Sequence, residues 1–92
     1  MVTWDERKRQ ANLRDHGLDF AGCEAVFDAP VITAEDSRKA YREQRINLLG
    51  WLQERVVHMT YTERGKTLRV ISLREATKHE TRYYFQAVSR GH

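Results

Sequence analysis

The strongest constraint on the fold is a two-residue alternation of apolar side chains in three consecutive segments, 46–52, 56–61 and 68–74. Successive side chains of a β-strand point to opposite faces, so this period predicts three strands. The connections Gln53–Glu54 and Glu63–Lys66 are short enough for hairpin turns, which predicts a three-stranded antiparallel meander. Apolar residues on both sides of two of these strands indicate that helices or a partner cover one or both faces of the sheet.

A first helix is predicted for residues 4–16, although its apolar stripe is thin. Thr3-x-x-Glu6 matches a capping box, and Asp5 is an alternative N-cap. Gly17 stands where a glycine commonly ends a helix.

A second, short helix is predicted for residues 19–27, with Asp19 as its N-cap and Pro30 shortly after its end. Residues 31–33 then begin a strand. Residues 34–44 are almost wholly polar and are expected to form an exposed loop.

The last predicted helix runs from about residue 77 to 89. Thr77-x-x-Glu80 is a second capping-box match, and apolar residues follow at helical spacing at Tyr84, Ala87 and Val88. The expected fold is therefore α+β over residues 1–92: two N-terminal helices, an antiparallel sheet of about four strands that contains the meander, and a C-terminal helix.

Composition suits one folded domain, because the chain has 92 residues with 40% hydrophobic and 32% charged side chains. No apolar run approaches the roughly 20 residues that span a bilayer, and the N-terminus lacks a signal-peptide core. We therefore expect a cytoplasmic protein without a membrane partner. Cys23 is the only cysteine, which leaves no internal disulfide and favours a buried, inert thiol over a nucleophile.

The net charge of +3 is concentrated in the last third of the chain. Residues 1–63 carry 9 Lys or Arg and 11 Asp or Glu, a balance of −2, whereas residues 64–92 carry 7 basic and 2 acidic side chains, a balance of +5. A localised basic patch attracts polyanions such as nucleic acid by releasing their counterions. A solvated face without a ligand is the alternative interpretation.

Arg74 and Glu80 are the leading candidates for chemistry. Strand alternation predicts that Arg74 shares a side with Leu68 and Val70 at the rim of the sheet, where its guanidinium could bind a phosphate or pair with a neighbouring carboxylate. Helical spacing turns Glu80 toward the sheet and Arg74. Its carboxylate could accept a proton from a ribose 2′-OH, or it could only cap the helix.

The start of the last helix adds Lys78, His79 and Arg82, next to backbone N–H groups that already favour anions. His79 could protonate a leaving 5′-oxygen, or it could be a surface residue. His58, inside a strand with apolar neighbours, is interpreted as a core or half-buried histidine. No set of side chains has the spacing of metal ligands, so neither a metal nor a cofactor is expected.

Aromatic side chains could stack on unpaired bases, and the candidates are Tyr41, Trp51, Tyr83 and Tyr84. For Trp51 and Tyr84, packing in the core is the favoured interpretation. Tyr83, at the edge of the apolar helix face, is more open to a ligand.

An ordered set of motifs resembles the BrnT toxins of bacterial type II toxin–antitoxin systems. Its N-terminal part consists of Trp4-Asp5, Asn12, His16-Gly17-Leu18 and Phe20. Its later blocks are Arg45-Ile46-x-x-x-Gly50, Arg69-Val70-Ile71-Ser72-x-Arg74-x-Ala76 and Glu80-x-x-Tyr83-Tyr84. Each block alone is a weak signal, but their order over nearly the whole chain is fairly specific.

This resemblance implies a compact RelE-like fold and metal-independent endoribonuclease cleavage of RNA that inhibits translation and growth. It also implies neutralisation by a cognate BrnA-type antitoxin, whose DNA-binding part is a ribbon-helix-helix dimer. The complex would repress its own operon, so operator DNA is expected to be bound only through the antitoxin.

The resemblance places Arg74 and Glu80 in the family's active-site region, with Arg45 and Arg82 as neighbours. The chemistry of the side chains then suggests a role for each. Arg74 and Arg45 would stabilise charge on the phosphate, Glu80 would be the base or an orienting group, and His79 or Tyr83 would protonate the leaving oxygen. RNA contacts are expected from Lys78, Arg82, Tyr83 and Arg69. Asn12 and His16, in the N-terminal motif, are expected to be largely structural.

Two other functions are open on the residues alone. A non-catalytic nucleic-acid-binding module would use the +5 segment without needing an acid or a base. An antitoxin-binding protein that no longer cleaves RNA would act only in repression. Asp15, Glu75 and Thr81, which differ from the residues common in the family, keep the second alternative open.

Overall fold

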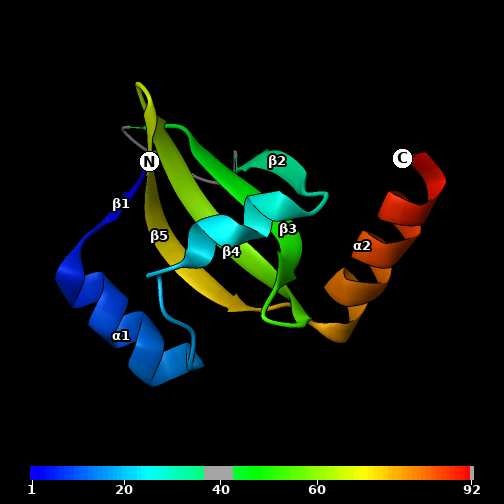
Figure 1. The fold of residues 1–92 in the computed structure, drawn as a ribbon, viewed down its shortest axis with the longest axis horizontal. Coiled ribbons are helices and arrows are strands. Elements are labelled where there is room, and N and C mark those ends of the chain that lie inside the picture. The colour runs from blue at the N-terminus through cyan, green and yellow to red at the C-terminus, as the bar shows by residue number, and fades with distance from the viewer. Residues whose placement is uncertain (37–42, 92) are drawn as a thin grey trace.

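The computed structural model describes residues 1–36 and 43–91 (Figure 1). Within these ranges no helix is both long and apolar enough to cross a membrane. The elements along the chain are β1 (Val2–Trp4), α1 (Glu6–His16), the 3-10 helix η1 (Cys23–Asp28), β2 (Ile32–Asp36), β3 (Arg45–Leu52), β4 (Arg55–Arg64), β5 (Thr67–Glu75) and α2 (Lys78–Gly91).

The sheet is mixed and five-stranded, with the strand order β1-β5-β4-β3-β2. The predicted meander is confirmed, because β4 pairs antiparallel with both β3 and β5, and β2 pairs antiparallel with β3. The four predicted antiparallel strands are β2 to β5, whereas β1, which pairs parallel with β5 and makes the sheet mixed, was not predicted. A strand of three residues has no period of its own, and its structure comes from a partner far along the chain.

The first helix begins later than predicted because the chain before it belongs to β1. Asp5, the alternative N-cap, accepts a hydrogen bond from the Lys8 N–H at 3.2 Å. Thr3 lies in β1, so its predicted capping role is wrong. Gly17 ends the helix in the left-handed conformation, as predicted.

The second predicted helix is shorter and tighter than expected. Only Cys23–Asp28 is helical, as a 3-10 helix, and Asp19 does not cap it. The Asp19 carboxylate instead accepts hydrogen bonds from the Ala21 N–H at 2.9 Å and from Arg9 at 3.1 Å. Asp19 therefore fixes the turn between α1 and η1 and ties this turn to α1.

The loop expected at 34–44 begins later than predicted. Residues 34–36 continue β2 and pair with residues 45–47 of β3. These polar residues carry no apolar alternation, which explains why sequence periodicity missed their strand. Residues 37–42, which include Tyr41, lie outside the described part of the chain.

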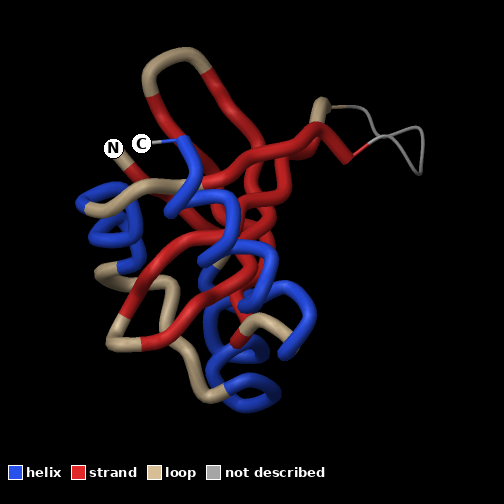
Figure 2. The backbone as a smooth tube through the Cα atoms, turned by 90° about the vertical axis from the view of Figure 1, so that its right-hand side faces the viewer, coloured by secondary structure: helices blue, strands red, loops and turns tan. Residues whose placement is uncertain are grey.

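Both hairpin turns use left-handed backbone. Gln53 and Glu54 have φ of 52° and 62°, the signature of the two-residue turn whose twist matches the flanking strands. Gly65, with φ of 60°, forms the turn between β4 and β5. In Figure 2 this second turn stands at the top, clear of the helices.

A β-bulge in β5 determines which side chains share a face. Ser72 pairs with Thr60, but Val70 pairs with the next residue of β4, Tyr61, so Ile71 has no counterpart. The bulge puts Leu73 on the same face as Val70, and both are buried in the core. Residues 72 and 74 consequently point to the opposite face.

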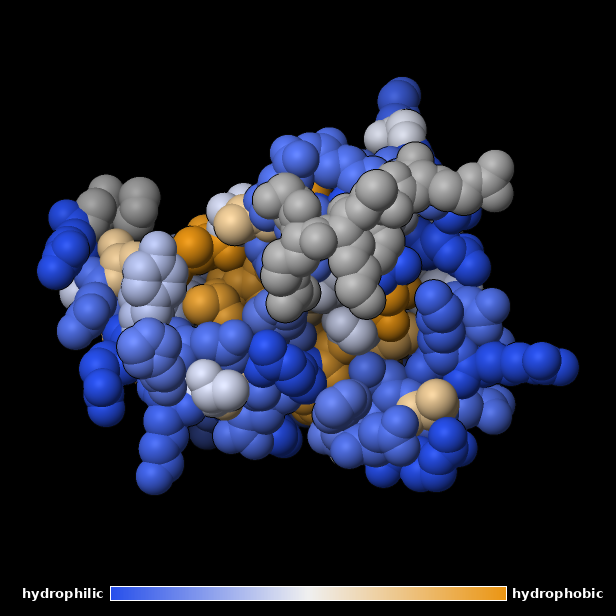
Figure 3. Space-filling view, turned by 180° about the vertical axis from the view of Figure 1, so that it is seen from behind, coloured by the Kyte–Doolittle hydropathy of each residue, from blue (hydrophilic) through white to orange (hydrophobic). Residues whose placement is uncertain are grey.

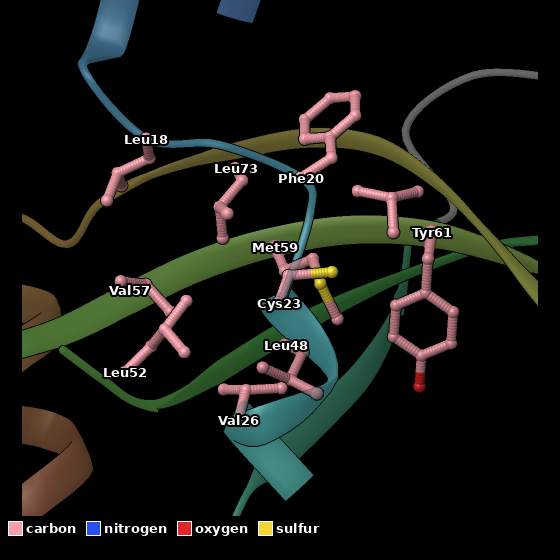
Figure 4. Packing of buried hydrophobic residues seen from close by; sticks show 11 residues of the cluster. Leu18, Phe20, Cys23, Val26, Leu48, Leu52, Val57, Met59, Tyr61 and Leu73 are labelled. Atoms are coloured by element: carbon pink, nitrogen blue, oxygen red, sulfur yellow. The ribbon is translucent and has the colours of Figure 1, made fainter. Parts of the chain in front are cut away.

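The hydrophobic core lies between the sheet and the segment that contains η1. Figure 4 shows Cys23 and Val26 of η1 facing Leu48 and Met59 of the sheet. Gly50 lets η1 approach β3, because a Cβ atom there would lie 2.5 Å from the Val26 Cγ2 atom. Burial of this apolar surface is the main favourable contribution to folding.

Asn12 joins α1 to the edge of β5. Its Nδ2 group donates to the Leu73 carbonyl at 2.7 Å and to the Leu18 carbonyl at 3.0 Å, and its Oδ1 atom accepts from the Leu73 N–H at 3.0 Å. The pairing of β1 with β5 ends at Val70, so the Asn12 amide takes the place of a strand partner beyond that point.

Candidate active site

The candidate residues Arg45, Arg69 and Arg74 lie on the face of the sheet opposite the core, which we call the polar face. Side chains that pair across strands share a face, so the pairings arrange this face in rows that run across β2, β3, β4 and β5. The rows are Ile32-Leu49-His58-Arg74, Ala34-Asn47-Thr60-Ser72 and Asp36-Arg45-Thr62-Arg69. α2 lies against this face beside the first row.

Arg74 and Glu80 form a two-pronged ion pair between β5 and α2. Arg74 Nη1 donates to Glu80 Oε1 at 2.9 Å, and Nη2 donates to Oε2 at 3.1 Å. Their predicted proximity is confirmed. The predicted side of the strand is wrong, because the bulge at Ile71 separates Arg74 from the face of Leu68 and Val70.

Glu80 also caps α2, as the sequence predicts. The Thr77 N–H donates to Glu80 Oε1 at 2.9 Å, and the Glu80 N–H donates to the Thr77 hydroxyl at 3.1 Å. This reciprocal pair is a complete capping box. The cap and the ion pair occur together, so the helix start holds the carboxylate in place for Arg74.

The hydrogen bonds from the Arg74 guanidinium lower the pKa of Glu80 from 4.5 to about 2. The Thr77 N–H and the nearby charge of His58 act in the same direction, while partial burial opposes them. The same contact raises the pKa of Arg74. A carboxylate with so low a pKa is a weak base near neutral pH, which favours an orienting role for Glu80.

Arg74 keeps a second pair of donors for a ligand. Its contacts with Glu80 and with the Glu75 carbonyl, at 3.2 Å, use both hydrogens of Nη1 and one of Nη2. Among the described residues nothing accepts from its Nε hydrogen or its remaining Nη2 hydrogen. These two hydrogens form a fork that suits two oxygens of a phosphate, and the side chain is 35% exposed.

His58 belongs to this site, although the sequence suggested only a core or half-buried histidine. It is the cross-strand partner of Arg74, half-buried on the polar face. His58 and Glu80 line the same pocket beside α2, and His58 contributes to the low pKa of Glu80. The pairing of β4 with β5, together with the bulge, places His58 beside Arg74. The apolar neighbours of His58 in the sequence gave no indication of this position.

Arg45 and Arg69 share the third row of the polar face. This row lies four residues along β4 from the row of Arg74, or about 14 Å at roughly 3.4 Å per residue. Both arginines are half-buried. The structure thus puts Arg45 on the same face as Arg74, in a different row of the sheet.

The remaining predicted residues lie on α2. Lys78, His79, Arg82 and Tyr83 are all exposed, and Tyr83 is 54% exposed. His79 precedes Glu80 by one residue, so it points about 100° away from it around the helix axis. His79 is therefore farther from the Arg74–Glu80 pair than its sequence position suggests.

The two aromatic residues assigned to the core have different environments. Tyr84 is buried, as predicted, and its hydroxyl donates to the Pro30 carbonyl at 2.7 Å. Trp51 is 39% exposed, so the prediction of core packing is wrong for it. Its ring lies 6.0 Å from the ring of Phe85 on α2, which is also exposed.

A pocket of about 230 Å³ opens between α2 and the strands β2 and β3. Side chains that line it include Ile32, Ala34, Asn47, His58, Glu80 and Tyr83. Apolar surface is visible beside α2 in the view from behind (Figure 3). The pocket therefore adjoins the ion pair and carries both apolar and polar groups.

The described residues contain no cluster of three or more His, Cys, Asp or Glu side chains that could hold a metal ion. Cys23 is buried in the core, and its burial raises the pKa of its thiol to about 12. This pKa agrees with the inert thiol predicted from the sequence.

A family model described as the ribonuclease toxin BrnT of type II toxin–antitoxin systems matches residues 4–80. The matched range includes Arg45, His58, Arg74 and Glu80, and it ends before Tyr83. No curated protein matches the chain.

Proposed function

The chain belongs to the BrnT family of ribonuclease toxins of type II toxin–antitoxin systems, and on that premise we propose that it cleaves RNA on the polar face of its sheet. As a member of this family it is an endoribonuclease toxin with a cognate antitoxin. The observation that carries the proposed site is the Arg74–Glu80 pair, whose unused guanidinium fork lies next to His58. We expect it to act in the cytoplasm.

The proposed reaction is attack of a ribose 2′-oxygen on the adjacent phosphorus. The new bond joins the 2′-oxygen to phosphorus, and the bond from phosphorus to the 5′-oxygen breaks. A proton leaves the 2′-OH, and a proton reaches the 5′-oxygen. The products are a 2′,3′-cyclic phosphate and a 5′-hydroxyl end, and no metal takes part.

In this proposal Arg74 binds the phosphate oxygens through its Nε and Nη2 hydrogens and stabilises the charge that develops on them. Glu80 holds the guanidinium in place from its other side. His58 gives a proton to the leaving 5′-oxygen, because it adjoins Arg74, whereas a carboxylate with the low pKa of Glu80 carries no proton near neutral pH. The proton of the 2′-OH passes to water. Arg45 and Arg69 would hold the RNA strand farther along the same face.

The first test is RNA cleavage by the purified protein, together with growth of a bacterium that expresses it. Arg74→Ala and His58→Gln should each lower the cleavage rate by about 10² or more, typical of losing one charge-stabilising or proton-transferring group. Arg14→Ala and His16→Gln are matched controls, because both residues are exposed on α1, away from the polar face. A wild type that neither cleaves RNA nor arrests growth would contradict the proposal.

Among the histidines, His79 is the alternative source of the proton. His79→Gln should reduce the rate less than His58→Gln, because His79 points away from the ion pair. The pH profile of kcat should change in His58→Gln and keep its wild-type shape in His79→Gln. The opposite ranking would move the acid to His79.

Metal removal gives a separate test of the chemistry. Treatment with a chelator should leave the cleavage rate unchanged, because no described cluster of side chains could hold a metal ion. Loss of activity that returns on adding a divalent cation would contradict the metal-independent reaction.

We further propose that the antitoxin is a BrnA-type protein with a ribbon-helix-helix DNA-binding part. The complex, and not the toxin alone, would bind operator DNA and repress the operon. Co-expression with the neighbouring small reading frame should restore growth, and a gel shift should require both proteins. A shift caused by the toxin alone would contradict this division of roles.

A further inference from the structure

We propose that the pocket between α2, β2 and β3 binds one nucleobase of the RNA, beside the phosphate at Arg74, and that Asn47 determines which base is preferred. This inference rests on the proposed function, because it takes RNA as the ligand. It adds a base-binding subsite that the phosphate chemistry at Arg74 does not require.

The size and lining of the pocket fit one flat ring. Its volume is about 230 Å³, below the roughly 300–1,000 Å³ of pockets that hold drug-sized ligands. Ile32, Ala34 and Leu49 from the polar face supply an apolar floor. Tyr83 lines the pocket from α2 and is 54% exposed, so its ring is accessible to a stacked base.

The strand register links this pocket to the phosphate site. Leu49, at the pocket floor, belongs to the row that continues through His58 to Arg74. Adjacent strands are about 4.8 Å apart, so two strand spacings separate Leu49 from Arg74, roughly 10 Å. This distance is within the reach of a single nucleotide whose base enters the pocket while its phosphate meets the guanidinium.

Asn47 supplies a fixed hydrogen-bond donor. The Thr60 hydroxyl, which is buried, donates to Asn47 Oδ1 at 2.8 Å. This contact uses one acceptor site of the Asn47 oxygen and orients the amide, which leaves its Nδ2 group to donate to a ligand. Glu80, across the pocket, keeps one acceptor site on Oε2, because Oε1 already accepts from both Arg74 and the Thr77 N–H. A donor and an acceptor on opposite sides of an apolar slot can distinguish bases by their edges.

The choice of occupant follows from what surrounds the pocket. One end of the pocket adjoins His58 and the ion pair of Glu80 with Arg74. Lys78 and Arg82 are exposed on α2, the helix that lines the pocket. An anionic chain that carries flat polar rings satisfies both the charges and the apolar slot. A purely apolar ligand would leave the Nδ2 donor of Asn47 without an acceptor.

Asn47→Asp tests the base preference. Aspartate keeps an acceptor for the Thr60 hydroxyl but replaces the Nδ2 donor with an oxygen. The products from an RNA with randomised bases at the cleavage site would be sequenced. We expect the preferred base to lose at least about fivefold against the other bases, the value of one hydrogen bond. Gln86→Glu, which makes the same charge change on exposed α2, should keep the wild-type preference.

Tyr83 tests the stacking surface. Tyr83→Ala should weaken binding of a short RNA by roughly 5- to 150-fold, the range for loss of one stacked base, and Tyr83→Phe should restore it. Binding is measured with a 2′-O-methyl oligonucleotide, which cannot be cleaved because its 2′-oxygen is blocked. This measurement does not depend on catalysis.

The two proposals fail in different ways. If the wild type cleaves RNA but Asn47→Asp and Tyr83→Ala leave base preference and binding unchanged, the base pocket is wrong and the phosphate site stands. If the wild type cleaves no RNA but binds the 2′-O-methyl oligonucleotide in a Tyr83- and Asn47-dependent manner, the pocket is supported and the proposed catalytic site is wrong.

Discussion

Glu80 connects two tasks in one side chain. One of its carboxylate oxygens accepts from the Thr77 N–H to start α2, and both oxygens accept from Arg74. The hydrogen bond from the Thr77 N–H holds the Glu80 carboxylate in place. The carboxylate then limits the rotamers that Arg74 can adopt. The sequence left open whether Glu80 caps the helix or contributes to the site. In the structure Glu80 caps α2 and, from that position, orients Arg74.

The acid dependence of stability should reveal this pair. The folded-state pKa of Glu80, about 2, lies below its unfolded value near 4.5, so the pair stabilises the fold above pH 4.5 and this contribution is lost as the pH falls toward 2. We expect Glu80→Gln to lower the free energy of unfolding by about 1–2 kcal/mol at neutral pH, after allowing for solvent screening. Urea denaturation at a series of pH values measures it, and the variant should lose less stability between pH 4.5 and 2 than the wild type.

Two controls separate the cap from the charge. Thr77→Ala removes the hydroxyl that caps the Glu80 N–H and keeps the ion pair, so it should lower stability by about 1 kcal/mol at every pH in this window. Glu6, whose pKa is also about 2, titrates in both proteins, so its contribution cancels in the comparison. Equal acid sensitivity of Glu80→Gln and the wild type would show that the pair does not stabilise the fold.

Asn12 is a second residue on which the stability of the fold should depend, because it bonds to three buried backbone groups. Asn12→Ala would leave the N–H and C=O groups of Leu73 and the Leu18 carbonyl without their side-chain partner in a buried place. Leaving such groups unsatisfied should lower the free energy of unfolding by about 2–4 kcal/mol. Thermal and urea unfolding measure the loss. The cleavage rate per folded molecule should not change, and a selective loss of activity would instead give Asn12 a role in the site.

At the level of elements, alternation in the sequence predicted the meander and its hairpins but not the face of each residue. One extra residue, Ile71, inverts the alternation within β5 and moves Arg74 away from the core face. Nothing in the local sequence marks this bulge, because Ile71 is as suitable for a regular strand as its neighbours. The predicted contact between Arg74 and Glu80 forms all the same, because α2 covers the face to which the bulge turns Arg74.

The other differences have similar causes. β1 forms only because β5 is beside it, and β2 carries polar residues on an edge, so neither has a period that a sequence can show. His58 was interpreted as a core or half-buried histidine because its neighbours are apolar, and the half-buried alternative is confirmed. Alternation defines two faces of a strand, but which face α2 covers is decided by tertiary packing. The helix caps, by contrast, are local interactions, and Asp5, Gly17 and the Thr77–Glu80 box could all be identified from the sequence.

Gly50 offers a test of how η1 packs on the sheet. A methyl group in Gly50→Ala would lie 2.5 Å from the Val26 Cγ2 atom, so η1 or β3 must shift. We expect a loss of about 1–3 kcal/mol in the free energy of unfolding. Val26→Ala removes the clashing atom, so the double variant should be more stable than the sum of the two single losses predicts. Strictly additive losses in urea denaturation would contradict the proposed contact.

At the level of the whole molecule, the charge is arranged by face and by segment. The first two thirds of the sequence are slightly acidic. Acidic and basic side chains there neutralise one another in ion pairs, such as those of Arg9 with Glu6 and Asp19. The basic excess lies in the segment that forms β5 and α2. A polyanion should therefore approach from the side of α2 and the polar face, where the pocket and Arg74 are found.

The salt dependence of RNA binding tests this arrangement. Each phosphate contact by a lysine or arginine contributes about 0.7 to the slope of log affinity against log salt for a single strand. The double variant Lys78→Gln, Arg82→Gln should therefore lower the slope by about 1.4 while keeping the base preference. Arg7→Gln with Lys8→Gln removes the same charge from exposed positions on α1 and should leave the slope unchanged. Equal effects of the two double variants would mean that net charge, and not its position on α2, attracts the RNA.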